Sequence, residues 1–408
     1  MILTLLAWLL CAAGIPVLAA ACYLAALTVA AFVNPRRRDI CGAFDRQRSH
    51  PAAFLILIPA HNEAAMIRRT LANLATLDYP PDKTEVIVVA DNCTDDTADI
   101  CRECGTVVLE RHDPGNPGKG QALDWAMRLH LAEWPNPFDA VVILDADSTV
   151  NSDFLWFLNE DFRKGREILQ GYYTVANPAE SWRTSLLTAS LGLFHFLRPL
   201  GRETFGLPCG IRGNGFVLSR RLVIHVGYPA FSNVEDVELT LFHALRDTHA
   251  GFVPGAHIYG EMTSQSDAAA TQRTRWEGGR ITMIKQWGPA LLKRAVRERS
   301  APCLDALVDL LIPPFALLGL LTGGIVLAAV LLVLSEPGTA ATAALCLSTA
   351  AVFCELLYVA GGLILIRAPL LVWRRMIFAP VYAVWKMAVY AKMLVNPASR
   401  RRWERTRR

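Results

Sequence analysis

Three long stretches of apolar residues constrain this chain more than any other feature of its sequence. The first, at 1–33, contains no charged side chain, and only a few charged residues lie in the other two, at 304–334 and 339–366. A helix needs about 20 apolar residues to cross the hydrocarbon core of a bilayer. We therefore expect each of the three stretches to form a transmembrane helix.

Basic residues mark one side of these stretches. Lysine and arginine side chains cluster at 36–38, 293–299, 367–375 and 399–408. Such clusters stay on the cytoplasmic side of a membrane. We therefore expect a multi-pass protein of the cell (inner) membrane, with a cytosolic domain at 40–300 and a basic cytosolic tail at 399–408. The segment 370–395 is apolar but contains Lys386 and Lys392, and we expect an interfacial or re-entrant helix there.

The remaining charged residues lie mostly in the middle of the chain. Hydrophobic residues make up 53% of the sequence and charged residues 19%, which is too apolar for a disordered chain. The net charge of +4 comes from the basic clusters beside the apolar stretches, and the middle region has no basic stripe with interleaved aromatic residues. The composition thus predicts a folded middle domain that binds no nucleic acid.

Short apolar runs alternate with turns and helical patterns in this middle region. Four runs are typical of strands buried on both faces, and they lie at 54–58, 86–89, 107–109 and 140–144. The alternation predicts an α/β domain with a Rossmann-like, mostly parallel sheet. Ligands of such sheets bind beyond the carboxyl ends of the strands, and the polar turns of this sequence lie at those ends.

Two of these turns suit a ligand that carries phosphate groups. Asp145 and Asp147 follow a strand at D-x-D spacing, so both carboxylates can point at one divalent cation such as Mg²⁺ or Mn²⁺. Lys119 stands between two glycines, where a backbone can approach a ligand closely. Each pattern also occurs in ordinary surface turns, so neither one identifies the ligand alone.

Several segments, in order along the chain, resemble the motifs of glycosyltransferase family 2. They lie at 58–63 (IPAHNE), Asp91, 118–123 (GKGQAL), 145–147 (DAD), 234–236 (VED) and 272–276 (QRTRW). DAD is similar to the metal-binding D-x-D motif, and VED resembles the T-E-D motif with valine in place of threonine. QRTRW matches the Q-x-x-R-W signature of membrane-integrated members. In this the chain resembles chitooligosaccharide, hyaluronan and poly-N-acetylglucosamine synthases and ceramide glucosyltransferase.

The resemblance implies a GT-A fold and an inverting transfer from a nucleotide sugar, usually a UDP-sugar, to give a β-linked product. It implies that Asp145 and Asp147 bind the Mg²⁺ or Mn²⁺ ion. The residues that it implies for nucleotide-sugar binding are Pro59, Ala60, Asn62, Glu63, Asp91, Lys119, Asp145 and Ala146. Those that it implies for catalysis are Asp236, as general base, with Glu235, Gln272, Arg275 and Trp276. On the acceptor side it implies Gly213, Asn214 and again Trp276.

Two kinds of acceptor stay open. A cell-surface or exopolysaccharide is preferred, because a bundle of membrane helices beside the active site would keep a growing chain engaged. Three spans are few for a secretion channel, and a homo-oligomer or a secretion partner is a candidate for completing it. The alternative is a non-processive enzyme that glycosylates a membrane lipid. An inactive scaffold and a transporter are the non-enzyme alternatives, and the retained aspartates and the large cytosolic domain argue against them.

One acidic residue stands inside an apolar stretch. Glu355 lies well within 339–366, where a carboxylate costs free energy and usually serves a function. We expect it to face the other helices, with a lysine of 370–395 as a candidate partner.

Overall fold

The computed structural model describes residues 2–41, 50–262 and 266–395, and for 41, 266–277 and 388–395 it describes the backbone alone. The chain divides into two compact units. Within the described ranges, the helical unit consists of residues 2–35, 178–205 and 311–395, and the sheet unit of residues 36–177 and 206–310. Each unit is described by itself.

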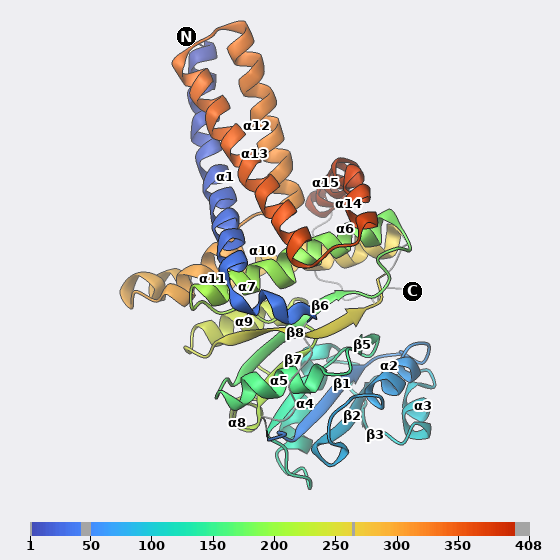
Figure 1. The fold of residues 1–408 in the computed structure, drawn as a ribbon. Helices are drawn as coiled ribbons and strands as arrows, with labels where there is room; N and C mark the ends of the chain where they lie inside the picture. Colours follow the sequence, from blue (N-terminus) through green and yellow to red (C-terminus); the bar gives the residue numbers. More distant parts are fainter. Residues whose placement is uncertain (1, 42–49, 263–265, 396–408) are drawn as a thin grey trace. The chain divides into compact units, whose positions relative to one another are not determined.

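One eight-stranded sheet forms the centre of the sheet unit (Figure 1). Its strands are β1 (Phe54–Ala60), β2 (Thr84–Asp91), β3 (Val107–Arg111), β4 (Ala140–Ile143), β5 (Ser148–Val150), β6 (Ile168–Val175), β7 (Phe216–Ser219) and β8 (Ala250–Gly260). Their spatial order is β3-β2-β1-β4-β7-β6-β8-β5. Because β1 lies between β2 and β4, the chain order reverses beside β1, and open α/β sheets bind ligands at such a reversal.

Most strands of this sheet run in one direction. β1 is parallel to β2 and β4, β2 is parallel to β3, and β6 is parallel to β8. Only β7 and β5 are antiparallel to their neighbours. The predicted fold class, a mostly parallel α/β sheet of the GT-A type with apolar helices flanking the domain, is thereby confirmed. The apolar run of β1 is buried almost throughout, as a strand covered on both faces requires.

The helices of the sheet unit pack against the sheet or against one another. They are α2 (Ile67–Leu74), α3 (Thr97–Glu103), α4 (Lys119–Ala126), a π-helical turn (Met127–Leu131), α5 (Phe154–Arg163), α8 (Arg220–His225), α9 (Glu235–Ala244), α10 (Ser266–Arg297) and α11 (Ala301–Leu311). α4 packs against β1 and β2, and α5 packs against β6 and β8. In α2 the buried residues Ile67, Leu71 and Leu74 recur at helical spacing, so one face of the helix joins the core.

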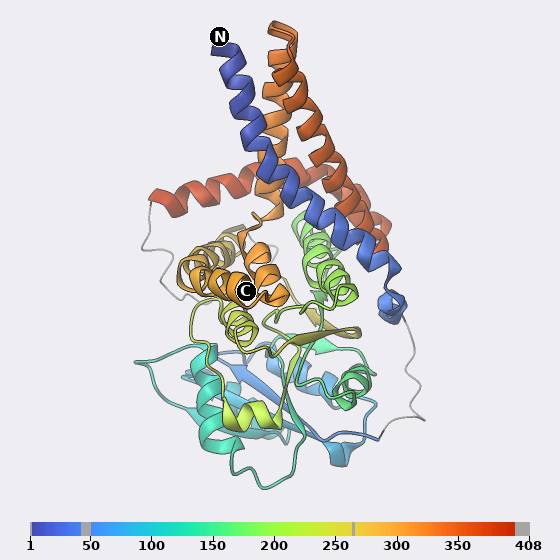
Figure 2. The same cartoon turned by 90° about the vertical axis from the view of Figure 1, so that its left-hand side faces the viewer.

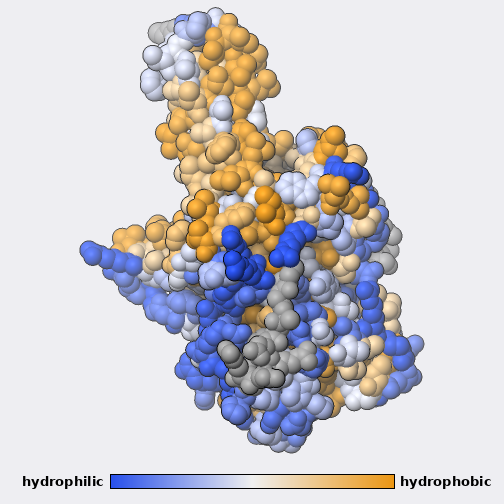
Figure 3. All heavy atoms as spheres, in the orientation of Figure 1, coloured by the Kyte–Doolittle hydropathy of each residue, from blue (hydrophilic) through white to orange (hydrophobic). Residues whose placement is uncertain are grey.

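The helical unit contains three helices that are long and apolar enough to cross a membrane: α1 (Ile2–Val33), α12 (Phe315–Ser335) and α13 (Thr339–Leu365). They pack against one another, and hydrophobic residues dominate their surface in Figure 3. The shorter helices of this unit are α6 (Trp182–Leu191), a π-helical turn (Gly192–Leu197), α7 (Arg198–Thr204), α14 (Leu370–Arg375) and α15 (Ala379–Val395).

Two boundaries differ from the ranges expected from the sequence. Residues 178–205, which the sequence analysis placed inside the domain at 40–300, cluster with the apolar helices. Asn34 Nδ2 donates a hydrogen bond to Leu200 O at 3.2 Å, and a Cβ atom on Gly201 would lie 2.3 Å from Leu27 O. The stretch 304–334 is two helices rather than one, because two prolines at 313–314 separate α11 from α12.

The segment 370–395 folds as α14, a 3₁₀ turn (Met376–Phe378) and α15. Within the helical unit α15 runs across the direction of α1, α12 and α13 (Figure 2). Arg375 fastens the start of this segment to α6, because its Nη1 donates to Ser181 O at 2.8 Å and to Ser185 Oγ at 3.1 Å. The interfacial interpretation of this segment stays a prediction.

Glu355 faces the other helices of its unit. Its side chain on α13 is buried, and its Oε1 accepts a hydrogen bond of 2.5 Å from Thr322 Oγ1 on α12. A hydroxyl on the neighbouring span therefore satisfies the carboxyl, which is what a polar group in an apolar bundle requires.

Candidate active site

The turns that follow β1 and β2 are joined to each other. His61 Nδ1 lies 2.7 Å from Asp91 O, and Glu63 N donates to Thr97 Oγ1 at 2.8 Å. Asn62 has a positive φ of 56°, a conformation that asparagine tolerates better than most residues. Its Oδ1 accepts a 2.7 Å hydrogen bond from Thr94 N. Pro59 and Ala60 thus end β1, and Asn62 and Glu63 lie on a turn that is fixed to the next one.

Asp91 is held by a buried cation that the sequence analysis missed. Arg111 Nη1, at the end of β3, lies 2.6 Å from Asp91 Oδ1, and both side chains are buried. The second oxygen, Oδ2, accepts a long hydrogen bond of 3.5 Å from Gly118 N. Asp91 therefore connects the edge of the sheet to the glycine–lysine–glycine turn. A helix and a strand separate Arg111 from Asp91 along the chain, so no short segment of the sequence indicates this pair.

The two glycines beside Lys119 serve different purposes. Gly118 has a φ of +136°, which residues with a side chain rarely adopt. Gly120 lies under the loop that leads to α9, and a Cβ atom there would lie 2.0 Å from Ala230 O. The first glycine thus permits the turn, and the second permits a close approach of backbone to backbone.

Lys119 brings three separate segments together. Its Nζ lies 2.5 Å from Asp145 Oδ1, donates to Gly213 O, and lies 3.9 Å from Glu235 Oε1. Burial of the ammonium lowers its pKa, but Asp145, Glu235 and Asp236 outweigh that effect and leave the pKa raised. Lys119 is therefore a cation surrounded by the acidic residues of two predicted motifs.

Asn214 holds the D-x-D turn through hydrogen bonds of its side chain. Its side chain is fully buried. Its Oδ1 accepts from Asp145 N at 3.0 Å, and its Nδ2 donates to Ser148 Oγ at 2.8 Å. Ser148 Oγ in turn donates to Asp147 Oδ1 at 3.1 Å. Asn214 thus holds the turn of both aspartates, and its expected place on the acceptor side stays a prediction.

Asp236 lies in the first turn of α9, and its carboxylate faces Gly213. A Cβ atom on Gly213 would lie 3.3 Å from Asp236 Oδ2. Burial raises the pKa of Asp236, and the Val237 N–H, Lys119 and Arg212 counteract that effect only in part. A carboxyl with a raised pKa is better suited to accept a proton than an ordinary aspartate.

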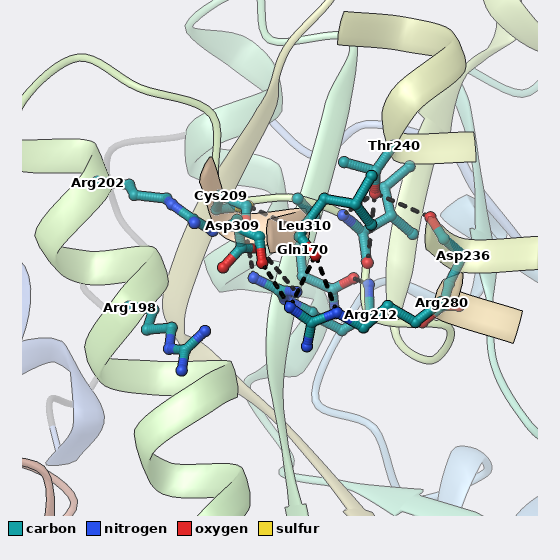
Figure 4. A network of polar contacts seen from close by, with 12 residues as sticks. Gln170, Arg198, Arg202, Cys209, Arg212, Asp236, Thr240, Arg280, Asp309 and Leu310 are labelled. Atoms are coloured by element: carbon teal, nitrogen blue, oxygen red, sulfur yellow. Dashed lines mark hydrogen bonds and ion pairs between the residues drawn. The ribbon is translucent and has the colours of Figure 1, made fainter. Parts of the chain in front are cut away.

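A polar network holds the loop before β7 beside α9 (Figure 4). Ile211 N donates to Thr240 Oγ1 at 2.8 Å, and Thr240 Oγ1 donates to Asp236 O at the same distance. Arg212 N donates to Gln170 Oε1 at 2.8 Å, and Gln170 Nε2 donates to Asn214 O, also at 2.8 Å. Sequence reasoning missed Gln170 and Thr240, because neither belongs to a recognisable motif.

Two residues beside Asp236 have structural tasks. Val234, which replaces the threonine of the T-E-D motif, is buried against α10, where a Cβ atom on Gly279 would lie 2.5 Å from Val234 Cγ1. Glu238 Oε2 accepts from Phe231 N at 2.9 Å and from Ser232 N at 2.8 Å. The hydrophobic side chain at position 234 is thus a packing residue, and Glu238 fixes the loop that Gly120 contacts.

Tyr228 is a further residue that the sequence analysis did not find. Its side chain is fully buried, and its hydroxyl has no hydrogen-bond partner within the described part of the chain. The pKa of Tyr228 is raised, first by burial and then by Glu235, Asp236 and Asp145. Its environment therefore includes acidic residues of both the D-x-D and the V-E-D segments.

Most predicted site residues of the sheet unit thus lie at the carboxyl ends of β1, β2 and β4 or in the turns that follow them. Lys119 contacts Asp145, Gly213 and Glu235, while Gly213 adjoins Asp236. The remaining three, Gln272, Arg275 and Trp276, lie on α10 in a part whose side chains are outside the described residues.

The donor set fits a hard divalent cation that is shared with a phosphate ligand. In the part of the chain that the structure describes, no group of three or more His, Cys, Asp or Glu side chains is arranged to hold a metal. Asp145 and Asp147 are half-buried, so they keep some access to a ligand. Mg²⁺ is commonly bound by one or two carboxylates together with substrate phosphates and water, and two such carboxylates are present.

Comparison with known proteins adds independent findings. The family model described as "Glycosyltransferase like family 2" matches residues 50–279. The probable glycosyltransferase YdaM of Bacillus subtilis is 30% identical over 237 residues, which are 55% of this chain and 54% of that protein. A beta-monoglucosyldiacylglycerol synthase of Nostoc sp. is 29% identical over 271 residues, 64% of this chain and 56% of that protein.

More distant relatives extend the comparison. A poly-beta-1,6-N-acetyl-D-glucosamine synthase of Staphylococcus epidermidis is 23% identical over 63% of this chain and 61% of that protein. The chain spans little more than half the length of the first two of these relatives. Among solved structures, the mannosyltransferase PcManGT of Pyrobaculum calidifontis, in complex with GDP-Man and Mn²⁺, aligns with a TM-score of 0.49 and 17% identity, over 85% of this chain and 98% of that one.

Proposed function

The chain belongs to glycosyltransferase-like family 2, and on this premise we propose that it transfers a sugar from a nucleotide sugar to an acceptor hydroxyl, with Asp236 as general base. The observation that carries the proposal is the meeting of Lys119, Asp145 and Glu235 beside Asp236. A cation and several carboxylates at one edge of the sheet suit a diphosphate and a developing oxyanion.

The chemical step would be a single displacement. The Asp236 carboxylate takes the proton of the acceptor hydroxyl while that oxygen forms a bond to the anomeric carbon of the donor. The bond from this carbon to the diphosphate breaks, and the nucleoside diphosphate leaves with the electron pair. Attack from the side opposite the leaving group inverts the anomeric centre, so an α-linked donor, which we propose to be a UDP-sugar, gives a β-linked product.

Each residue near the diphosphate would have a defined task. Asp145 and Asp147 would hold Mg²⁺ or Mn²⁺, which neutralises charge on the leaving group. Lys119 would supply a second positive charge. Asp91 and Glu63 would hold the nucleoside, and the ion pair with Arg111 would keep the Asp91 carboxylate in place.

For the acceptor we propose a growing polysaccharide, with a membrane lipid as the second candidate. The poly-beta-1,6-N-acetyl-D-glucosamine synthase among the relatives supports the first. Two observations support the second candidate. The beta-monoglucosyldiacylglycerol synthases have a higher identity to this chain than that polysaccharide synthase has. The described residues also contain few candidate spans. The size of the product distinguishes them, because a polymer and a glycolipid separate readily by gel filtration and thin-layer chromatography.

The activity test uses the purified full-length protein in membrane-like vesicles. Nucleotide sugars with different bases and sugars are supplied one at a time, and the released nucleoside diphosphate is measured. We expect release with at least one UDP-sugar, loss of release in Asp236→Asn, and unchanged release in Asp82→Asn. The Asp82 side chain is exposed and lies just before the start of β2, at the opposite end of that strand from Asp91. Wild-type turnover in Asp236→Asn would disprove the assignment of the base.

We further propose that the sheet unit lies on the cytosolic side of the cell membrane. The basic clusters that flank the apolar helices support this orientation. Single cysteines at Lys285 and at Gly338, in a variant without the natural cysteines, should react differently with a membrane-impermeant maleimide in intact cells. Labelling of position 285 but not of position 338 would refute the proposed orientation.

A further inference from the structure

Lys119 contacts the same Asp145 carboxylate that the proposed metal ion would need. Its Nζ lies 2.5 Å from Asp145 Oδ1, close enough for a charge-assisted hydrogen bond. The same ammonium donates to Gly213 O and lies 3.9 Å from Glu235 Oε1. The ammonium therefore already neutralises the acidic group that the proposed metal needs.

A lysine and a divalent cation cannot both contact one carboxylate closely without repelling each other. A bound diphosphate changes this balance, because its oxygens give the ammonium a new anionic partner and give the metal additional ligands. Lys119 can make such a move, because its long side chain is flexible and about one fifth of it, 22%, is exposed.

From this geometry we propose that Lys119 acts as a placeholder for the metal, so that the ion binds tightly only together with the nucleotide. The inference rests on the proposed function, since it concerns the same metal and the same donor. Its consequence is a coupling between two ligands: nucleotide strengthens metal binding and, by linkage, metal strengthens nucleotide binding equally. Lys119 is here a positioning residue for metal entry, and no chemical step is assigned to it.

The test measures binding of Mn²⁺ to the purified full-length protein, without and with UDP, by the electron paramagnetic resonance signal of free Mn²⁺. In the wild type we expect weak binding without UDP and tight binding with it. In Lys119→Met, binding without UDP should become tighter by about tenfold, which is in the usual range of coupling between sites. The strengthening by UDP should shrink in the same variant.

Three further variants sharpen the test. Lys119→Gln removes the charge but keeps a hydrogen-bond donor, so it should behave like Lys119→Met and serves if the methionine variant does not fold. Lys119→Arg keeps the charge and should retain the weak binding of the wild type. Lys164→Met removes a lysine that pairs with Glu160 and Asp161 at 2.9 and 3.1 Å, and it should change nothing.

The outcomes separate this inference from the proposed function. If the wild type binds no Mn²⁺ even with UDP, the proposed metal site fails and the inference fails with it. If the wild type shows the coupling but both neutral variants bind Mn²⁺ without UDP no more tightly than the wild type, the placeholder role of Lys119 alone is overturned.

Discussion

Asp236 and Gly213 are in such close contact that a single methyl group would disturb them. A Cβ atom on Gly213 would lie 3.3 Å from Asp236 Oδ2, and the residue has a φ of +79°. The proposed base is thus aligned by the backbone of another segment, which also offers its carbonyl oxygen to Lys119. The predictions below follow from contacts of this kind.

Gly213→Ala should lower the rate of sugar transfer strongly while nucleotide binding persists. Its new methyl group pushes on the Asp236 carboxylate, which has to shift by a few tenths of an ångström, and the positive φ costs about 1–2 kcal/mol of folding free energy in addition. Gly105→Ala is the matched control, because Gly105 has a φ of +73° and no atom within 4 Å of its added Cβ. Equal loss of activity in both variants, at equal melting temperature, would show that the methyl contact with Asp236 is unimportant.

Asp236→Asn should reduce transfer by about 10²–10⁴-fold, the usual contribution of a positioned base. Because burial raises the pKa of Asp236, the acid limb of the kcat/KM profile should lie above the pH range of an ordinary aspartate. The rate falls as pH falls through this raised pKa, because protonation removes the base. A profile that stays flat down to the ordinary range would contradict this explanation.

The same pKa shift predicts an effect on stability. A carboxyl whose pKa is raised by folding destabilises the folded state once the pH exceeds its unfolded pKa. Asp236→Asn should therefore have a higher melting temperature than the wild type at neutral pH. The difference should vanish at acidic pH, where both states of the wild type are protonated. Thermal unfolding across the pH range measures this, and a variant that is less stable at neutral pH would refute it.

Gly279→Ala should destabilise the sheet unit by about 1–3 kcal/mol, because overpacking a filled core forces its neighbours apart. The new Cβ atom would lie 2.5 Å from Val234 Cγ1. Val234→Ala alone should also destabilise the protein, since it leaves a cavity. The double variant should lose less than the sum of the two, with a coupling of about 0.5–3 kcal/mol. Strict additivity in chemical denaturation would mean that the two side chains do not share one space.

Removal of divalent metal should stop transfer. A chelator in excess is expected to abolish release of nucleoside diphosphate, and addition of Mn²⁺ or Mg²⁺ beyond the chelator should restore it. Full turnover in the presence of the chelator would exclude the proposed role of Asp145 and Asp147 as metal ligands.

Much of this fold could be predicted because its signals are local. The apolar runs that became β1, β2 and β4 are each buried on both faces, and such runs are visible in a short window of sequence. The D-x-D and glycine–lysine–glycine turns follow the same logic, since strand ends and turn residues are neighbours in the chain. For this reason the turns that carry the predicted site residues could be located from the sequence, while the roles of those residues stay predictions.

The parts that sequence reasoning missed depend on contacts between distant segments. The ion pair of Arg111 with Asp91 and the support of Asp145 by Asn214 join elements that no periodicity connects. The assignment of 178–205 to the helical unit was missed likewise, because Arg198 and Arg202 make this segment look like part of a water-soluble domain. In the structure both arginines are buried, and Arg198 Nε donates to Tyr358 OH at 2.8 Å.

The close approach of Gly120 to Ala230 has a consequence for protein engineering. A chimera that takes 50–150 from one relative and 206–244 from another would bring together two segments whose backbones touch only because position 120 has no side chain. Such a hybrid should assemble only if the first parent also has glycine at the position of Gly120. Attempts to exchange donor specificity and acceptor specificity independently would therefore have to keep the contact of Gly120 with Ala230 intact.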